Sequence, residues 1–161
     1  MQPTGATAPK PDSNPAPKVP YPHRIGFTEP HRHGILLGHE RDSPALSRWM
    51  RTVVPRLARR NALQVAQALV SNAHRHTRSG DPGGTVRVVV DINPFLITVS
   101  VTDGGPRRDT PIPYPRLGNR HGPPHTGLHL VDHLAVYWEW DWEWKGAALG
   151  PLTVRAVIEN P

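Results

Sequence analysis

The sequence predicts an α+β domain, a two-layer sandwich in which helices cover one face of a mixed, mostly antiparallel sheet. Two helical segments follow one another, two strand segments are joined by a short turn, and a further helix precedes two more strands. Strands linked by hairpins form antiparallel sheets, and these helices stand apart from the hairpins in the sequence. We therefore expect the strands to form one layer and the helices to form the other.

A Pro-rich segment precedes this pattern. Residues 1–24 are expected to be a disordered tail, and residues 25–161 are expected to form the folded domain. The first 23 residues contain seven prolines, separated mainly by small and polar residues. Such a composition buries too little apolar surface to offset the entropy of ordering the chain. The alternative interpretation is an arm that docks a partner.

The composition excludes several classes of function. The absence of cysteine rules out disulfides, thiolate metal sites and a cysteine nucleophile. The sequence has neither an apolar run long enough to span a membrane nor the apolar centre of a signal peptide, so a cytoplasmic protein without membrane contact is expected. The formal net charge is +6, carried mainly by arginine, and no nucleic-acid-binding motif accompanies it. Direct binding of nucleic acid is therefore not expected.

The first elements are a strand and a helix. The apolar run at 35–37 predicts a strand, and the Asp-Ser-Pro sequence at 42–44 is typical of a helix start. The helix is expected over 44–59, kinked or shortened by Pro55, which removes a hydrogen-bond donor. Its apolar face is expected to hold Leu46, Trp49, Val53 and Leu57.

A second helix and a hairpin follow. Apolar residues at helical spacing predict a helix over 61–76. The Gly- and Pro-rich cluster at 79–84 predicts a turn. Two β-branched runs at 85–92 and 95–102, separated by Asn-Pro, predict an antiparallel hairpin.

The C-terminal part begins with a long loop. Residues 106–124 lack periodicity and are rich in Pro, Gly and Arg, which is typical of a functional or disordered loop. A helix is expected over 126–135, and strands over 136–144 and 152–158. The first of these strands alternates strictly and places four tryptophans on one face, namely Trp138, Trp140, Trp142 and Trp144. The simpler interpretation is a buried core face, and the alternative is an exposed aromatic surface for a partner.

Three segments carry a resemblance to a known family. They are ALVSNAHRH at 68–76, VTDGGP at 101–106 and TGLHLVD at 126–132. Their order and spacing resemble the N, G1 and G2 boxes of the GHKL ATPases, which include gyrase and sensor histidine kinases. Over residues 35–158 the chain most resembles the bacterial anti-sigma factor serine/threonine kinases. The resemblance implies a Bergerat-type ATP-binding fold with ATP and Mg²⁺ as cofactors.

The N-box segment provides the expected metal ligand. The resemblance implies that the side-chain oxygen of Asn72 binds Mg²⁺, an ion that takes few protein ligands and keeps water and phosphate oxygens. His76, which ends the same segment, is expected in the same cofactor site. Taken alone, Asn72 is better explained as a solvated helix residue, and only the other two segments favour the metal-binding role.

The other two segments provide the expected nucleotide contacts. An Asp at a strand end can accept a hydrogen bond from the amino group of adenine, and the resemblance assigns this role to Asp103. Gly105 would let the backbone approach the base closely, and Thr153 would lie near adenine. Gly127 and Leu128 would present free helix N–H groups to phosphate. The simpler interpretations are a turn at Asp103, a β-favouring residue at Thr153 and an ordinary helix start. The loop at 106–124 would be the lid over the phosphates.

The chain departs from the family pattern at three positions. The N box usually has a glutamate one helical turn before Asn72, and this position is Ala68. An alanine cannot orient or deprotonate an attacking hydroxyl, so no catalytic residue is assigned. Arg107 replaces a second glycine of the G1 box, and His125 replaces a glycine of the G2 box.

The resemblance implies an ATP-binding regulatory protein of the anti-sigma factor kinase type, which controls transcription. Its partners would be a sigma factor, an anti-anti-sigma protein or both, and it would be a homodimer. The alternative is a pseudo-kinase of the same fold that switches partners without efficient phosphoryl transfer. A basic nucleic-acid-binding protein is a distant third interpretation.

A second pattern concerns histidine. His125, His129 and His133 recur every four residues, a spacing that can place imidazoles on one helix face to bind zinc. No carboxylate completes a known zinc pattern, so an ordinary surface is the preferred interpretation.

Overall fold

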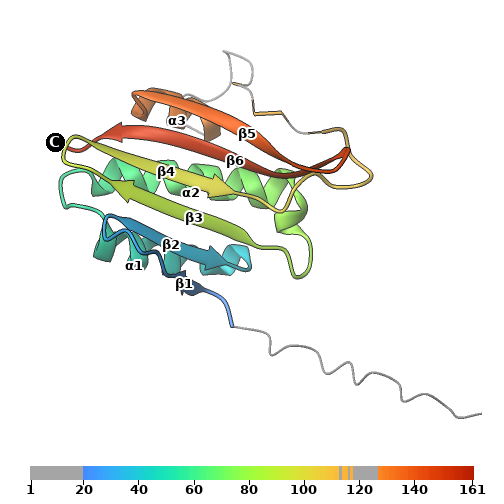
Figure 1. Cartoon of the computed structure of the whole chain (residues 1–161), viewed down its shortest axis with the longest axis horizontal. Helices are drawn as coiled ribbons and strands as arrows, with labels where there is room; N and C mark the ends of the chain where they lie inside the picture. Colours follow the sequence, from blue (N-terminus) through green and yellow to red (C-terminus); the bar gives the residue numbers. More distant parts are fainter. Residues whose placement is uncertain (1–19, 113, 116, 118–126) are drawn as a thin grey trace, which may run out of the picture.

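The computed structural model describes residues 20–161 except 113, 116 and 118–126. These residues form a six-stranded antiparallel sheet in the order β1-β2-β3-β4-β6-β5, together with three α-helices that lie behind the sheet in Figure 1. The α+β two-layer fold is confirmed, with an open sheet. The elements are β1 His23–Ile25, β2 Arg32–Leu37, α1 Ser43–Val53, α2 Arg59–His76, β3 Val86–Ile92, β4 Leu96–Thr102, α3 Gly127–Leu134, β5 Tyr137–Lys145 and β6 Ala148–Glu159, with short 3₁₀ turns η1 Glu40–Asp42 and η2 Arg78–Gly80.

Helix α1 is shorter than its apolar pattern predicts. It ends at Val53, and Val54 adopts an extended backbone conformation. The following Pro55 imposes this conformation, because its ring clashes with a helical residue before it. Continuation of the helix to residue 59 was therefore wrong. The expected burial of Leu57 was also wrong, because its side chain is 74% exposed.

Helix α2 is the central element of the helical layer. Its apolar face is fully buried, with residues at helical spacing: Ala62, Val65, Ala66, Leu69, Val70 and Ala73. The helix packs between α1 and α3 and against β3 and β4. At its end the Ala73 carbonyl accepts from both the backbone N–H of Thr77 at 3.1 Å and the Thr77 hydroxyl at 2.7 Å, so the last turn of the helix is held by two hydrogen bonds.

The predicted hairpin of β3 and β4 is confirmed, with Val88 opposite Val101. Its turn is closed by Asn93, whose Oδ1 accepts hydrogen bonds from the backbone N–H groups of Phe95 and Leu96. A short amide side chain that accepts nearby backbone N–H groups is typical of such turns. Strand β6 then pairs with β4, and it places its own inward residues beside those of the hairpin.

Strand β5 forms one edge of the sheet, and this position limits how well its tryptophan face is covered. Trp138 reaches α3, where its Nε1 donates to Asp132 Oδ1 at 2.9 Å. Trp142 is 9% exposed, whereas Trp140 and Trp144 are 38% and 65% exposed. The interpretation of all four rings as core was therefore wrong for Trp140 and Trp144.

Strand β1 forms the opposite edge, pairing with β2 from His23 onward. The first strand thus begins two residues before residue 25, where the folded domain was expected to begin. Residues 1–19 of the expected tail lie outside the described part of the chain. None of the described helices is both long enough and apolar enough to cross a membrane.

Candidate functional site

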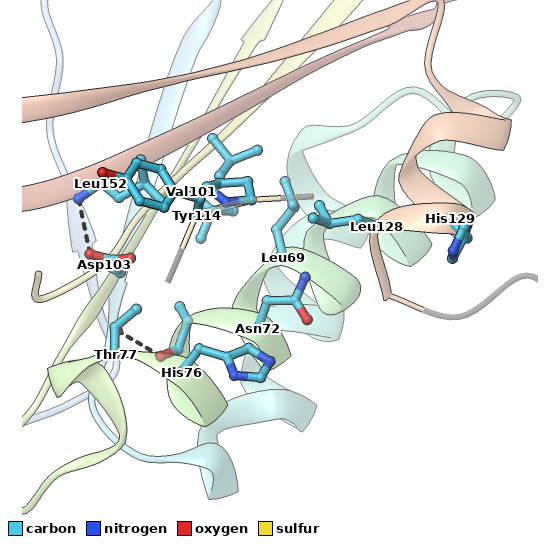
Figure 2. A pocket seen from close by; sticks show the side chains of 13 residues that line it. Leu69, Asn72, His76, Thr77, Val101, Asp103, Tyr114, Leu128, His129 and Leu152 are labelled. Carbon is cyan, nitrogen blue, oxygen red and sulfur yellow. Dashed lines mark hydrogen bonds between the residues drawn. The ribbon is translucent and has the colours of Figure 1, made fainter. Parts of the chain in front are cut away.

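A pocket of about 440 Å³ lies between the helical layer and the end of the sheet, within the size range of small-molecule sites. Helix α2 contributes Asn72 and His76, the end of β4 contributes Asp103, and α3 contributes Leu128. Figure 2 shows these side chains around the pocket. The structure therefore brings together one or more predicted residues from each of the three motif segments. The remaining wall is mainly apolar, formed by Leu69, Val101, Leu152 and Val154.

Asp103 is held rigidly at one end of the pocket. It follows the last residue of β4 and is only 8% exposed. Its Oδ1 accepts hydrogen bonds from the backbone N–H groups of Gly105 at 2.7 Å and Leu152 at 3.0 Å. Among the described residues none donates to Oδ2, which leaves that oxygen available to a ligand. We call this region, with its apolar neighbours, the base end of the pocket.

Burial raises the pKa of Asp103 above the ordinary value of an aspartate, because the charged form loses water. The two backbone hydrogen bonds and the nearby Arg78 act in the opposite direction but do not cancel the effect. The carboxylate is thus a strongly oriented acceptor whose ionised form is costly.

Gly105 shapes the base end without lining it. Its backbone has φ +88°, and an added Cβ would lie 2.9 Å from the Gly150 carbonyl oxygen. Only glycine adopts this conformation without strain and leaves room for the neighbouring strand. Gly105 was expected to let the backbone approach a base closely. The close approach that the structure shows is to the Gly150 carbonyl of β6 instead.

The opposite end of the pocket, which we call the phosphate end, is formed by α2 and the start of α3. Asn72 makes no hydrogen bond with a described residue, and its Oδ1 lies 3.8 Å from the place of a Cβ on Gly127. Gly127 itself is not part of the lining, whereas Leu128 is. A free amide oxygen fits a Mg²⁺ ion that is held chiefly by phosphate oxygens and water.

His76 lies at the same end. Partial burial lowers its pKa, and the charges of Arg75 and Arg107 add to the effect. The imidazole is therefore neutral at neutral pH, so it can accept or donate one hydrogen bond but adds no positive charge.

Thr153, like Gly105 and Gly127, is a predicted site residue that does not line the pocket. Its hydroxyl lies 2.8 Å from that of Thr102, its partner on β4, and the two residues flanking it, Leu152 and Val154, line the pocket instead. Successive side chains of a strand point to opposite faces, so Thr153 lies on the face away from the helices.

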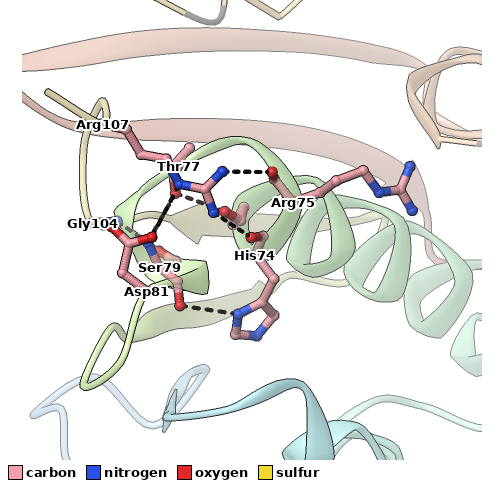
Figure 3. A network of polar contacts seen from close by, with 8 residues as sticks. His74, Arg75, Thr77, Ser79, Asp81, Gly104 and Arg107 are labelled. Atoms are coloured by element: carbon pink, nitrogen blue, oxygen red, sulfur yellow. Dashed lines mark hydrogen bonds and ion pairs between the residues drawn. The ribbon is translucent and has the colours of Figure 1, made fainter. Parts of the chain in front are cut away.

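Two of the three positions at which the sequence departs from the family pattern, Ala68 and Arg107, lie in the described part of the chain. Ala68 is half-buried and packs against the core, without lining the pocket. Arg107 extends to the end of α2, as Figure 3 shows. Its Nε donates to Asp81 at 3.1 Å, and its terminal nitrogens donate to the carbonyls of Arg75 at 3.2 Å and His74 at 3.4 Å. Arg107 therefore fastens the loop after β4 to the end of α2 and leaves the pocket open.

Two lining residues, Tyr114 and His129, were not among the predicted site residues. Tyr114 lies in the loop that was expected to form a lid, and its aromatic ring in a Pro-rich loop was an available signal. His129 was considered only for zinc. Its Nε2 is buried and has no hydrogen-bond partner among the described residues.

Two expectations fall partly or wholly outside the described residues. The third departure, His125, is one of them, so the expected zinc triad of His125, His129 and His133 lies partly outside the described residues. Within the described residues no three His, Asp or Glu side chains are grouped to hold a metal ion. Most of the second half of the expected lid at 106–124, including 118–124, is also outside them.

Comparison of the sequence with family models and with curated proteins gives no match.

Proposed function

We propose that this chain is an ATP-binding regulatory protein of the anti-sigma factor serine/threonine kinase type. The observation that carries the proposal is the pocket itself. It collects Asn72, Asp103 and Leu128 from three segments far apart in the sequence, the same segments that resemble nucleotide-binding boxes. A purely structural origin of each motif would not require them to meet around one cavity.

The base end suits adenine. The exocyclic amino group would donate to Oδ2 of Asp103, while Oδ1 stays fixed by two backbone N–H groups. The apolar side chains of Val101, Leu152 and Val154 would contact the faces of the ring. Guanine carries a carbonyl oxygen at the corresponding position, and that oxygen would face the carboxylate as a second acceptor. The arrangement therefore favours ATP over GTP.

The phosphate end suits a magnesium-bound triphosphate. Asn72 would provide one oxygen to Mg²⁺, and the start of α3 beside it would provide backbone N–H groups to phosphate. In this role Mg²⁺ neutralises phosphate charge, and His76 adds a neutral polar group at the rim.

A specific observation favours an impaired kinase. Ala68 occupies the position one turn before Asn72, and its methyl group packs against the core. Phosphoryl transfer depends mainly on positioning and charge neutralisation, so nucleotide binding does not need a carboxylate at this position. The second candidate is accordingly a pseudo-kinase that binds nucleotide and switches between partners. In either case the proposed partners are a sigma factor or an anti-anti-sigma protein, and the proposed assembly is a homodimer.

The test is calorimetric titration with ATP, with and without Mg²⁺, on the wild type and on Asp103→Asn. The amide keeps an acceptor for the two backbone N–H groups but presents N–H donors to the base. We expect a wild-type Kd on the order of micromolar that requires Mg²⁺, and weaker binding by the variant. Absence of binding up to roughly 1 mM ATP would contradict the proposal.

GTP provides the specificity control in the same titration. It carries the same triphosphate, so binding through the phosphates alone gives equal affinities for the two nucleotides. A clear preference for ATP that disappears in Asp103→Asn would locate the discrimination at the base end.

A further inference from the structure

We propose that Tyr114 stacks on the base of the bound nucleotide and so acts as a specificity-determining residue. The inference rests on the proposed nucleotide site and adds a contact that none of the three motifs contains. It concerns a residue from the loop after β4, which approaches the base end from the side opposite α2.

The position of Tyr114 carries the first part of the argument. The residue lines the pocket together with Asp103 and Leu152, and Figure 2 shows its ring beside these two residues. The side chain is 50% exposed. A large aromatic ring in this position presents apolar surface to the pocket at the point where Asp103 would fix the edge of a base.

The support behind the ring carries the second part. The Tyr114 ring centroid lies 6.0 Å from that of Trp140 and 6.4 Å from that of Trp142, with interplanar angles of 60° and 85°. Tilted and edge-on contacts at these distances are favourable for aromatic pairs. The two tryptophans thus position the ring of a residue whose own backbone belongs to a loop.

The sheet register explains why this aromatic support adjoins the pocket. Trp142 pairs with Leu152, and Trp140 pairs with Val154. Both β6 residues line the pocket, so the tryptophan face of β5 continues the pocket wall outward. This also gives a role to the partly exposed tryptophan face, because Trp140 and Trp142 contact the ring of Tyr114.

Chemistry determines what such a ring recognises. Every nucleobase has a planar π-face, and base–aromatic stacking contributes to affinity without depending on hydrogen-bond pattern. Asp103 would read the edge of the base, and Tyr114 would require that the ligand be flat and aromatic. The two residues together define a site for an adenine nucleoside rather than for a triphosphate alone.

The test uses adenosine, which has no phosphates, and ATP with Mg²⁺, titrated into the wild type, Tyr114→Ala and Tyr114→Phe. Tyr137→Ala is the matched control, because Tyr137 has a similar exposure of 52% but does not line the pocket. We expect Tyr114→Ala to weaken both ligands about tenfold. Tyr114→Phe keeps the ring and should bind within about twofold of the wild type, as should the control. Thermal melting of each variant verifies that it is folded.

The outcomes separate this inference from the function on which it rests. Wild-type affinity in folded Tyr114→Ala overturns the stacking role and leaves the nucleotide site intact. A loss in Tyr114→Phe equal to that in Tyr114→Ala also overturns it, because the ring would then not be the contributing group. Absence of adenosine and ATP binding by the wild type overturns both proposals.

Discussion

The two ends of the pocket are built on different principles. At the base end, Asp103 is buried and fixed by two backbone N–H groups, and the surrounding wall is apolar strand. At the phosphate end, Asn72 has no hydrogen bond with a described residue, and His76 is largely exposed. The carboxylate at the base end is therefore fixed by the fold, whereas no described residue fixes the Asn72 amide at the phosphate end.

This difference separates the groups that would recognise the base from the groups that would assist phosphoryl transfer. Base recognition needs an oriented acceptor and a shaped wall, and both are present without ligand. Phosphoryl transfer is speeded by a base near the attacking hydroxyl, and the position next to the phosphate end is Ala68. Under the proposed function, the pocket has the groups that would bind a nucleoside and lacks one group that would speed the transfer of its phosphate.

Under the proposed function, the largest expected effect comes from introducing a carboxylate next to the phosphate end. Ala68→Glu places a carboxylate one helical turn before Asn72, and we expect the rate of phosphate release from ATP to rise about 10²–10⁴-fold. The measurement is a steady-state phosphate assay with Mg²⁺. Ala68→Gln is the matched control, with similar size and no base. Equal rates for the two variants at unchanged ATP affinity would refute the role assigned to this position.

Changes at the base end should affect affinity rather than rate. Asp103→Ala removes the acceptor for the ligand and leaves the N–H groups of Gly105 and Leu152 unpaired. We expect adenosine affinity to fall about 10- to 100-fold and the free energy of unfolding to fall by about 1–3 kcal/mol. Asp103→Asn should lose affinity but keep most of the stability. Calorimetry and chemical denaturation measure the two quantities, and equal stability losses in both variants would contradict the role of Oδ1.

The pH dependence of adenosine affinity provides a further test of the base end. The pKa of Asp103 is raised by burial, so the carboxylate becomes protonated at a higher pH than an ordinary aspartate. The proton would reside on Oδ2, because Oδ1 already accepts two hydrogen bonds, and Oδ2 would then face the amino donor of adenine as a second donor. Adenosine affinity should therefore fall on acidification, beginning above the usual aspartate range.

The same shift has a defined effect on stability. Since the folded-state pKa lies above the unfolded-state value, the ionised carboxylate lowers the free energy of unfolding at neutral pH, and this cost disappears as the pH falls through the folded-state pKa. Titrations of the wild type and Asp103→Asn across pH test both statements. If adenosine affinity falls on acidification with the same size and midpoint in Asp103→Asn, the pH dependence of binding belongs to another group.

The smallest expected effect lies outside the pocket. Arg107→Ala removes three hydrogen bonds to Asp81 and to the end of α2. The guanidinium is partly exposed, so we expect the free energy of unfolding to fall by only about 1 kcal/mol, with unchanged nucleotide affinity. Arg108→Ala is the control, because Arg108 is exposed. Loss of affinity in Arg107→Ala without loss of stability would show that Arg107 contacts the ligand.

Much of the fold follows from local signals. Helix α2 and the hairpin of β3 and β4 were predicted within one or two residues, because helical and alternating periodicities are strong over these lengths. The effect of Pro55 was foreseen as a kink or a shortening, and the shortening occurred. Leu57 was misplaced because the apolar pattern continues after the helix has ended.

The membership of the pocket was predictable in part. Asn72, His76, Asp103 and Leu128 were named from the motifs and meet at the cavity. Thr153 was expected there, but the strand alternation assigns the pocket to its neighbours. Tyr114 and His129 line the pocket but were not among the predicted site residues. The aromatic ring of Tyr114 in a Pro-rich loop was a local signal, but no local pattern tells which distant strand a side chain reaches.

The sequence by itself determined the order of the strands and helices from β2 onward, the ends set by proline and asparagine, and the three motif segments, because each depends on neighbouring residues. It did not predict strand β1. Only the tertiary structure decided that β5 is an edge strand, that Trp142 is covered while Trp144 is not, and that Arg107 fastens α2 rather than entering the pocket. These outcomes depend on which strands pair and in which register, and such pairings between distant segments are determined by the burial and hydrogen bonding of the whole sheet.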